Sequence, residues 1–201
     1  INRAIMNGET ETGVTTFLLN HEIDKGAIIG QIREPIHPED NIGTLYDRLM
    51  NIGKGLVTET VDRIAAGDCT PVVQEHIDES TLRPAPKIFK DDCLVDWTWD
   101  GRRIIDFIRG LSPYPAAWTR MLRDGEDAGS AKIFAAHFEP LTDGDTETPG
   151  AIVSDNRTYM SVRCNDGYIC IDSIQIAGKK RLSVRELLAG FRDAGQYRFS
   201  H

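Results

Sequence analysis

A short polar stretch between two β-rich segments holds the side chains best suited to chemistry. It comprises Asn20, His21, Glu22, Ile23 and Asp24, and a turn glycine, Gly26, follows. A carboxylate before a glycine turn can point back at a sheet edge, orient a histidine and stabilise its cation during proton transfer. Asp24 is therefore a candidate catalytic residue. From spacing alone, a turn-capping Asp24 and an exposed, uninvolved His21 are the simpler interpretations.

A second candidate is a cluster of cations on a predicted turn. Lys179, Lys180 and Arg181 are adjacent, and Arg185 follows at the start of a predicted helix. Three neighbouring cations on a turn form a compact anion-binding patch suited to phosphates. The alternative is an ordinary solvated turn.

Aromatic side chains gather in two further segments, 96–99 and 113–118. Such residues pack against a core more often than they stack on bases, so we expect them to be packing anchors.

The sequence predicts no metal site. Outside the polar loop, the histidines lie in separate segments, at His37, His76, His137 and His201. The cysteines, Cys69, Cys93, Cys164 and Cys170, form no Cys-X-X-Cys motif and no zinc-like spacing with histidine. We expect four reduced thiols in a cytoplasmic protein.

The composition limits the class of protein. The chain has 201 residues, of which 40% are hydrophobic, and a net charge of −8. This length predicts one large or two small domains. Apolar runs are only a few residues long, so we expect no membrane span. An acidic chain does not coat nucleic acid non-specifically, so any such partner would need a local basic patch.

Residues 1–67 show an α/β pattern. It consists of a short helix over 1–6, strands over 12–19 and 27–36, and a long helix that Asn41 caps and Gly67 ends. The helix's apolar residues from Leu45 to Ile64 are predicted to share one face. Ile1 is not an initiator residue, and two strands cannot close a sheet. We therefore expect a piece of a longer chain, with the partner half of this domain upstream.

Two further zones follow. Residues 68–89 contain three prolines and few large apolar residues, which predicts a linker. Residues 90–201 begin with a helix over 100–109 and continue with several short β segments. Asn165-Asp166-Gly167 is a hairpin signal, and Ser183 with Glu186 forms a capping box for a last helix. This pattern predicts a small barrel or sandwich.

Several segments resemble the methionyl-tRNA formyltransferase family, in the family's order and over nearly the whole chain. They are Asn7–Thr15, Ile23–Gly26, Gly43–Leu49, Pro86–Phe89, Ile108–Trp118 and Ala177–Ser183. The first four are shared with other enzymes that use formyltetrahydrofolate, whereas the last two favour the tRNA enzyme. The resemblance implies an α/β plus β fold: the carboxy-terminal half of a Rossmann-like formyltransferase domain (1–67), a linker (68–89) and an OB-like β-barrel domain (90–201).

The resemblance also implies a reaction. The family transfers a formyl group from 10-formyltetrahydrofolate to the α-amino group of methionine on initiator tRNA, without a metal. Asn and His stabilise the tetrahedral oxyanion and handle the proton, and Asp holds the His. Asp24 matches that Asp, and Asn20–Ile23 match the folate-binding segment. The family's Asn and His should lie upstream of Ile1, so we expect the 201 residues alone to be inactive.

Other functions remain open. A sugar-nucleotide formyltransferase can share the two-domain arrangement. A non-catalytic RNA-binding module would need only the β-rich domain, whose candidate tRNA-binding residues are Lys179, Lys180, Arg181 and Arg185. In each case we expect a monomer that does not bind membranes. A catalytic Asp24 must face a groove that can accept a pterin, because a side chain in bulk solvent has nothing to orient.

Overall fold

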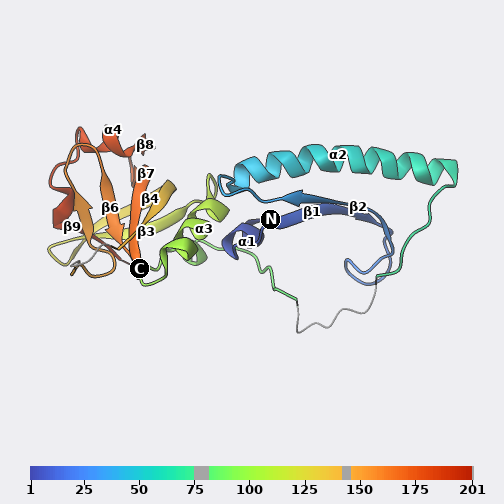
Figure 1. Cartoon of the computed structure of the whole chain (residues 1–201), viewed down its shortest axis with the longest axis horizontal. Coiled ribbons are helices and arrows are strands. Elements are labelled where there is room, and N and C mark those ends of the chain that lie inside the picture. The colour runs from blue at the N-terminus through green and yellow to red at the C-terminus, as the bar shows by residue number, and fades with distance from the viewer. Residues whose placement is uncertain (75–81, 142–145, 201) are drawn as a thin grey trace.

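The computed structural model describes residues 1–74, 82–141 and 146–200. Two regions lie side by side along the long axis (Figure 1). The first contains α1 (Asn2–Met6), β1 (Glu11–Phe17), β2 (Ile28–Pro35) and α2 (Ile42–Ala66). The second contains α3 (Gly101–Leu111), the short helix α4 (Val184–Leu188) and all the remaining strands. Among the described residues, no helix combines the length and the apolar character needed to cross a membrane.

In the first region, β1 and β2 form an antiparallel ribbon against which α2 packs. The caps of α2 are as predicted. The Asn41 side chain accepts a hydrogen bond from the Thr44 amide at 3.1 Å, and Gly67 adopts the left-handed conformation that ends the helix. The segment after α2 returns to the ribbon, where Val72 and Ile28 exchange two backbone hydrogen bonds of 2.8 Å.

The prediction that α2 has a single apolar face is wrong. The helix buries Leu45, Leu49 and Leu56 against the ribbon and the junction with α3, but Val61 and Ile64 are 58% and 50% exposed. The apolar residues therefore fall into two stripes. Only one stripe has a packing partner among the described residues, because a two-stranded ribbon covers only one side of the helix.

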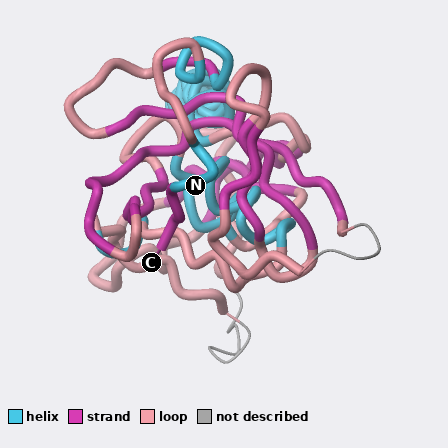
Figure 2. The backbone as a smooth tube through the Cα atoms, turned by 90° about the vertical axis from the view of Figure 1, so that its left-hand side faces the viewer, coloured by secondary structure: helices cyan, strands magenta, loops and turns pink. Residues whose placement is uncertain are grey.

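The second region is a nearly closed β-barrel, as the fold class predicted. Its strands are β3 (Ala117–Arg123), β4 (Glu126–Pro140), β5 (Ile152–Ser154), β6 (Met160–Arg163), β7 (Gly167–Ile176), β8 (Leu182–Ser183) and β9 (Tyr197–Ser200). They pair antiparallel in the order β5-β6-β7-β4-β3-β9, and β8 pairs with β7. The last strand returns to the segment before β5, where the Phe199 amide donates to the Gly150 carbonyl at 2.8 Å. Figure 2 looks at this end of the molecule, where the strands curve around one another.

The barrel has its own core. Trp97 is 2% exposed, packs against Phe199 with ring centroids 5.6 Å apart, and donates to the Thr119 hydroxyl at 3.0 Å. Helix α3 adds Ile104 and Ile108, both essentially buried. This arrangement confirms the expectation that the first aromatic segment packs.

A smaller core lies within the first region. It consists of Ile5, Ile36, Ile42, Leu45 and Leu49. Contacts of α1 and α2 with α3 join this region to the barrel. The Asn2 side chain donates to the Gly110 carbonyl at 2.8 Å. The predicted linker includes residues 75–81, which lie outside the described residues, and the predicted boundaries at 67/68 and 89/90 remain predictions.

Candidate functional site

Hydrogen bonds to its backbone hold the polar loop between β1 and β2 in place. The Leu18 amide donates to the Ala27 carbonyl at 2.9 Å, and the Gln74 side chain donates to the carbonyls of Asp24 and Gly26 at 2.8 Å. A Cβ on Gly26 would lie 1.5 Å from the Leu18 carbonyl oxygen, so this close approach requires glycine. The loop's shape is thus set by its ends and by the chain that returns after α2.

The side chains of this loop face outward. Residues 20–24 are all exposed, and the apolar side chains of Leu19 and Ile23 are 91% and 89% exposed. Asp24 has a φ of 57°, and its backbone carbonyl accepts the hydrogen bond from Gln74. Among the described residues, Asp24 lines neither the groove described below nor any of four other surface hollows. The expectation that it faces a groove is therefore not met within the described residues, and its catalytic role stays a prediction.

A groove of about 710 Å³ lies where the linker crosses the barrel. Its walls come from α1, from linker residues 85–90, from the loop between α3 and β3, and from β3 and β4. Four cations line it: Arg3, Lys87, Lys90 and Lys132. None of its lining residues, all of them described, carries a carboxylate. In a chain with a net charge of −8, this separation of charge creates a local site for an anion.

Aromatic rings alternate with these cations. The Trp118 indole donates to the Lys90 carbonyl at 2.8 Å, and the Lys90 ammonium lies 5.5 Å from the centre of the same ring. The Lys87 ammonium lies 5.3 Å from the Phe89 ring. Tyr114 is 81% exposed at the groove's rim, so the expectation that this aromatic segment packs is wrong for Tyr114.

The predicted cation turn adjoins this groove. The Ala177 amide donates to the carbonyl of Ser130, a groove residue, at 2.9 Å. The Lys179 carbonyl accepts from Gln175, which pairs with Lys132 across β4 and β7. The register of these two strands therefore brings the turn to the groove, although the two are separated by more than 40 positions in sequence.

The four predicted cations of the turn are all exposed, but they differ in their contacts. Arg181 donates to the Ser173 hydroxyl at 2.8 Å, and its guanidinium lies 4.3 Å from the Phe134 ring centre. Lys179 and Lys180 project from the turn, and Arg185 lies on α4. Figure 1 shows the β1–β2 loop at the other end of the molecule from the barrel, so the structure does not bring the two predicted sites together.

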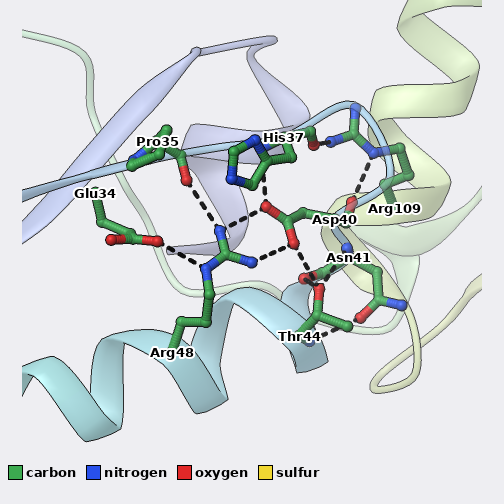
Figure 3. A network of polar contacts seen from close by, with 8 residues as sticks. All are labelled: Glu34, Pro35, His37, Asp40, Asn41, Thr44, Arg48 and Arg109. Atoms are coloured by element: carbon green, nitrogen blue, oxygen red, sulfur yellow. Dashed lines mark hydrogen bonds and ion pairs between the residues drawn. The ribbon is translucent and has the colours of Figure 1, made fainter.

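A polar network around the buried Asp40 links α3, and with it the barrel, to the first region (Figure 3). Arg48 of α2 donates to both carboxylate oxygens of Asp40, one at 2.7 Å, and to Glu34 at 2.7 Å. These hydrogen bonds hold the pKa of Asp40 well below its usual range, against the opposing effect of burial. Arg109 of α3 donates to the Asp40 and His37 carbonyls, both at 2.7 Å.

The groove cations were not predicted as a site because they come from separate segments. Arg3, the residues 87–90 and Lys132 meet only through the packing of α1, the linker and the barrel. The signal that could have found them is the alternation Lys87-Ile88-Phe89-Lys90, since interleaved cations and aromatics are typical of RNA-binding surfaces.

Comparison with known proteins identifies the family. The profile described as formyl transferase, C-terminal domain, matches residues 87–192, which is more than half of the chain. A second profile, described as formyl transferase, matches residues 1–61. The chain belongs to the formyl transferase family.

Among curated proteins, a methionyl-tRNA formyltransferase of Bacteroides fragilis is 48% identical over 192 residues. That match covers 95% of this chain and 59% of the relative. The chain spans about three fifths of the length of the curated relatives that it matches.

Solved structures share the fold at low identity. HypX from Aquifex aeolicus, in complex with tetrahydrofolic acid, matches with a TM-score of 0.64 and 20% identity, over 93% of this chain and 31% of its own. The N-formyltransferase from Helicobacter canadensis, in complex with folinic acid and dTDP-3-aminofucose, matches with a TM-score of 0.55 and 19% identity, over 89% and 59%. At these identities the likeness concerns the fold alone.

Proposed function

We propose that this chain forms part of an enzyme that transfers a formyl group from 10-formyltetrahydrofolate to the α-amino group of methionyl initiator tRNA. The observation that carries the proposal is the groove, which is lined by four cations and no carboxylate in an acidic chain. The identity to relatives named methionyl-tRNA formyltransferase supports the same assignment. The protein would act as a monomer in the cytoplasm, where charged tRNA is used.

The groove and the adjoining turn would hold the RNA. Lys87, Lys132 and Lys179 supply charges for phosphates on one continuous surface. The exposed rings of Phe89 and Tyr114 offer flat faces for unpaired bases, such as those at the single-stranded 3′ end of a tRNA. A surface that combines both features fits the junction between a duplex and a single strand.

The loop between β1 and β2 would face the formyl donor. Leu19 and Ile23 present apolar side chains that a pteridine ring could cover, and Asp24 lies next to them. In the proposed step the amine attacks the formyl carbon and a tetrahedral oxyanion forms. The bond from that carbon to N10 of the folate then breaks, and the amine's proton passes to N10. Asp24 would hold a His that relays this proton, and both this His and the oxyanion-stabilising Asn must come from the part of the relatives that this chain does not span.

Binding of tRNA tests the groove directly. The double variant Lys87→Ala/Lys132→Ala should weaken binding of methionyl initiator tRNA by about tenfold near physiological salt. It should also lower the slope of log affinity against log salt by about 2, because each phosphate contact contributes about 1. The matched control is Lys54→Ala/Arg157→Ala, which removes the same charge from two exposed positions outside the groove. Equal effects of both double variants would contradict the groove assignment.

Exchanging the amine that accepts the formyl group distinguishes the tRNA enzyme from a sugar-nucleotide formyltransferase. In a full-length protein that contains this segment, formyl transfer should require methionyl-tRNA, and a sugar-nucleotide amine should not replace it.

Asp24→Asn in that full-length protein should lower turnover by orders of magnitude without changing its stability. Near-normal turnover would return Asp24 to a turn-capping role. Tight tRNA binding without any transfer by the full-length protein would favour a non-catalytic RNA-binding module.

A further inference from the structure

Two neighbouring strands of the barrel place four side chains with metal-binding chemistry on one face. β4 contributes His137 and Glu139, and β7 contributes Cys170 and Asp172. His137 lies directly opposite Cys170 in the antiparallel register. Alternate residues of a strand point to the same side, so the other two side chains join this pair. The expectation of no metal site considered spacing along the chain, where the β4 pair and the β7 pair lie more than 30 positions apart.

The donor atoms of three of these residues are close to one another. One ligand atom each from His137, Glu139 and Cys170 lie within 4.8 Å of one another. The Nε2 atom of His137 is 3.9 Å from Oε1 of Glu139. The His137 and Glu139 side chains are 57% and 65% exposed, so both have room to adjust around an ion, whereas Cys170 is 8% exposed and fixes the floor of the site.

The surrounding contacts orient two of the ligands. Nδ1 of His137 lies 3.1 Å from Oδ2 of Asp172, which fixes the imidazole so that Nε2 points toward Glu139. Metal-binding histidines commonly donate their second nitrogen to a carboxylate in this way. The Ser161 hydroxyl donates to the Cys170 sulfur at 3.3 Å and fixes its position. Burial raises the pKa of the Cys170 thiol, so a bound ion would have to displace its proton.

We propose that His137, Glu139 and Cys170 bind a Zn²⁺ ion that joins β4 to β7. Nitrogen, sulfur and oxygen ligands suit this borderline-soft ion, and three protein ligands leave a fourth position for water. Ligand bonds of about 2.0–2.3 Å require donor atoms roughly 3.3–3.7 Å apart, so the side chains draw together on binding. Asp172 is a positioning residue, because it acts through His137.

Cobalt provides a spectroscopic test on the full chain, reduced and stripped of metal with a chelator. Co²⁺ should bind with about one equivalent and give the near-ultraviolet absorption of a cobalt–thiolate bond, which Zn²⁺ should abolish by displacement. His137→Ala and Cys170→Ser should both remove this absorption. Asp172→Asn should keep the absorption and weaken the affinity for Co²⁺ by 10- to 100-fold, as expected for a residue that orients a ligand.

Cys69→Ser is the matched control, because it removes a free thiol of the described chain outside the cluster. It should leave the cobalt spectrum and affinity unchanged. Absence of the thiolate absorption in the unaltered chain, its persistence in Cys170→Ser, or an equal loss in Cys69→Ser would overturn the proposal. If Cys170→Ser does not fold, the exposed His137→Ala decides the question: an unchanged spectrum in that variant overturns the site.

Discussion

The barrel and the β1–β2–α2 region differ in how completely they bury their own apolar side chains. The barrel surrounds Trp97, Ile104 and Phe199 and returns its last strand to the segment before β5. The first region has only a small core around Leu45 and Leu49, and it leaves Leu19 and Val61 exposed. The barrel is thus a self-contained support for the groove, whereas the loop with Asp24 lies on a surface whose apolar side chains have no cover among the described residues.

Truncation of the barrel's central tryptophan should show the largest difference between the regions. Trp97→Ala removes a buried ring and leaves the Thr119 hydroxyl without that donor, so we expect a loss of about 3–5 kcal/mol in the free energy of unfolding. Denaturant unfolding followed by the fluorescence of Trp99 and Trp118 reports on the barrel. Val61→Ala on the exposed stripe of α2 is the comparison, and it should cost less than about 0.5 kcal/mol. Similar losses would mean that the stripe is covered in solution.

A smaller loss is expected at the junction. Asp40→Asn removes the charge that Arg48 contacts with two donors, which should cost about 2 kcal/mol. The effect should be larger in the first region, which contains both partners of this contact. Two probes can show this: helical circular dichroism reports mainly on α2, and fluorescence reports on the barrel, since all three tryptophans lie at residues 97–118. Asp47→Asn, an exposed position of the same helix, is the control. A loss confined to the fluorescence transition would contradict the role of this network.

Acid should weaken the first region through the same network. Its hydrogen bonds lower the pKa of Asp40 in the folded state, so the stabilisation is present above the ordinary carboxyl pKa of about 3.9 and is lost as the pH falls below it. Between about pH 5 and pH 3, the dichroism transition of the unaltered chain should move to lower denaturant more than that of Asp40→Asn does. The comparison is with this variant and not with the barrel, because hydrogen bonds from Thr158 also lower the pKa of Asp155 there. Equal shifts in the two proteins would contradict the explanation.

Local sequence signals predicted most of the elements. The capping residues Asn41 and Ser183 mark the starts of α2 and α4, Gly67 ends α2, and the turn before Gly167 joins β6 to β7. Each signal acts within a few residues, so a pattern in the sequence can reveal it. The strand β9, Tyr197–Ser200, escaped prediction because it is short and pairs with β3, more than 70 positions away.

The sites were harder to predict because their residues are distant in sequence and meet only in the folded chain. The groove combines Arg3, Lys87 and Lys132 from three distant segments, and the proposed zinc ligands meet only through the register of β4 and β7. Spacing along the chain carries no sign of the zinc ligands, and of the groove it shows only the alternation in residues 87–90. The loop 20–24 is contiguous, so a local pattern can single it out as a candidate, but its exposure depends on what covers the first region, which no local pattern encodes.

The smallest expected effect concerns how that loop is held. Gln74→Ala removes both hydrogen bonds from the side chain to the Asp24 and Gly26 carbonyls, which should cost about 1 kcal/mol of local stability. Amide hydrogen exchange in residues 18–27 should accelerate by about fivefold, while the global unfolding of both regions stays unchanged. Gln31→Ala is the matched control, since it removes only a side-chain hydrogen bond of 3.0 Å to Thr15 on the exposed ribbon. If exchange in the loop does not respond, the segment after α2 does not fix the loop's shape, and its order depends instead on what covers Leu19 and Ile23.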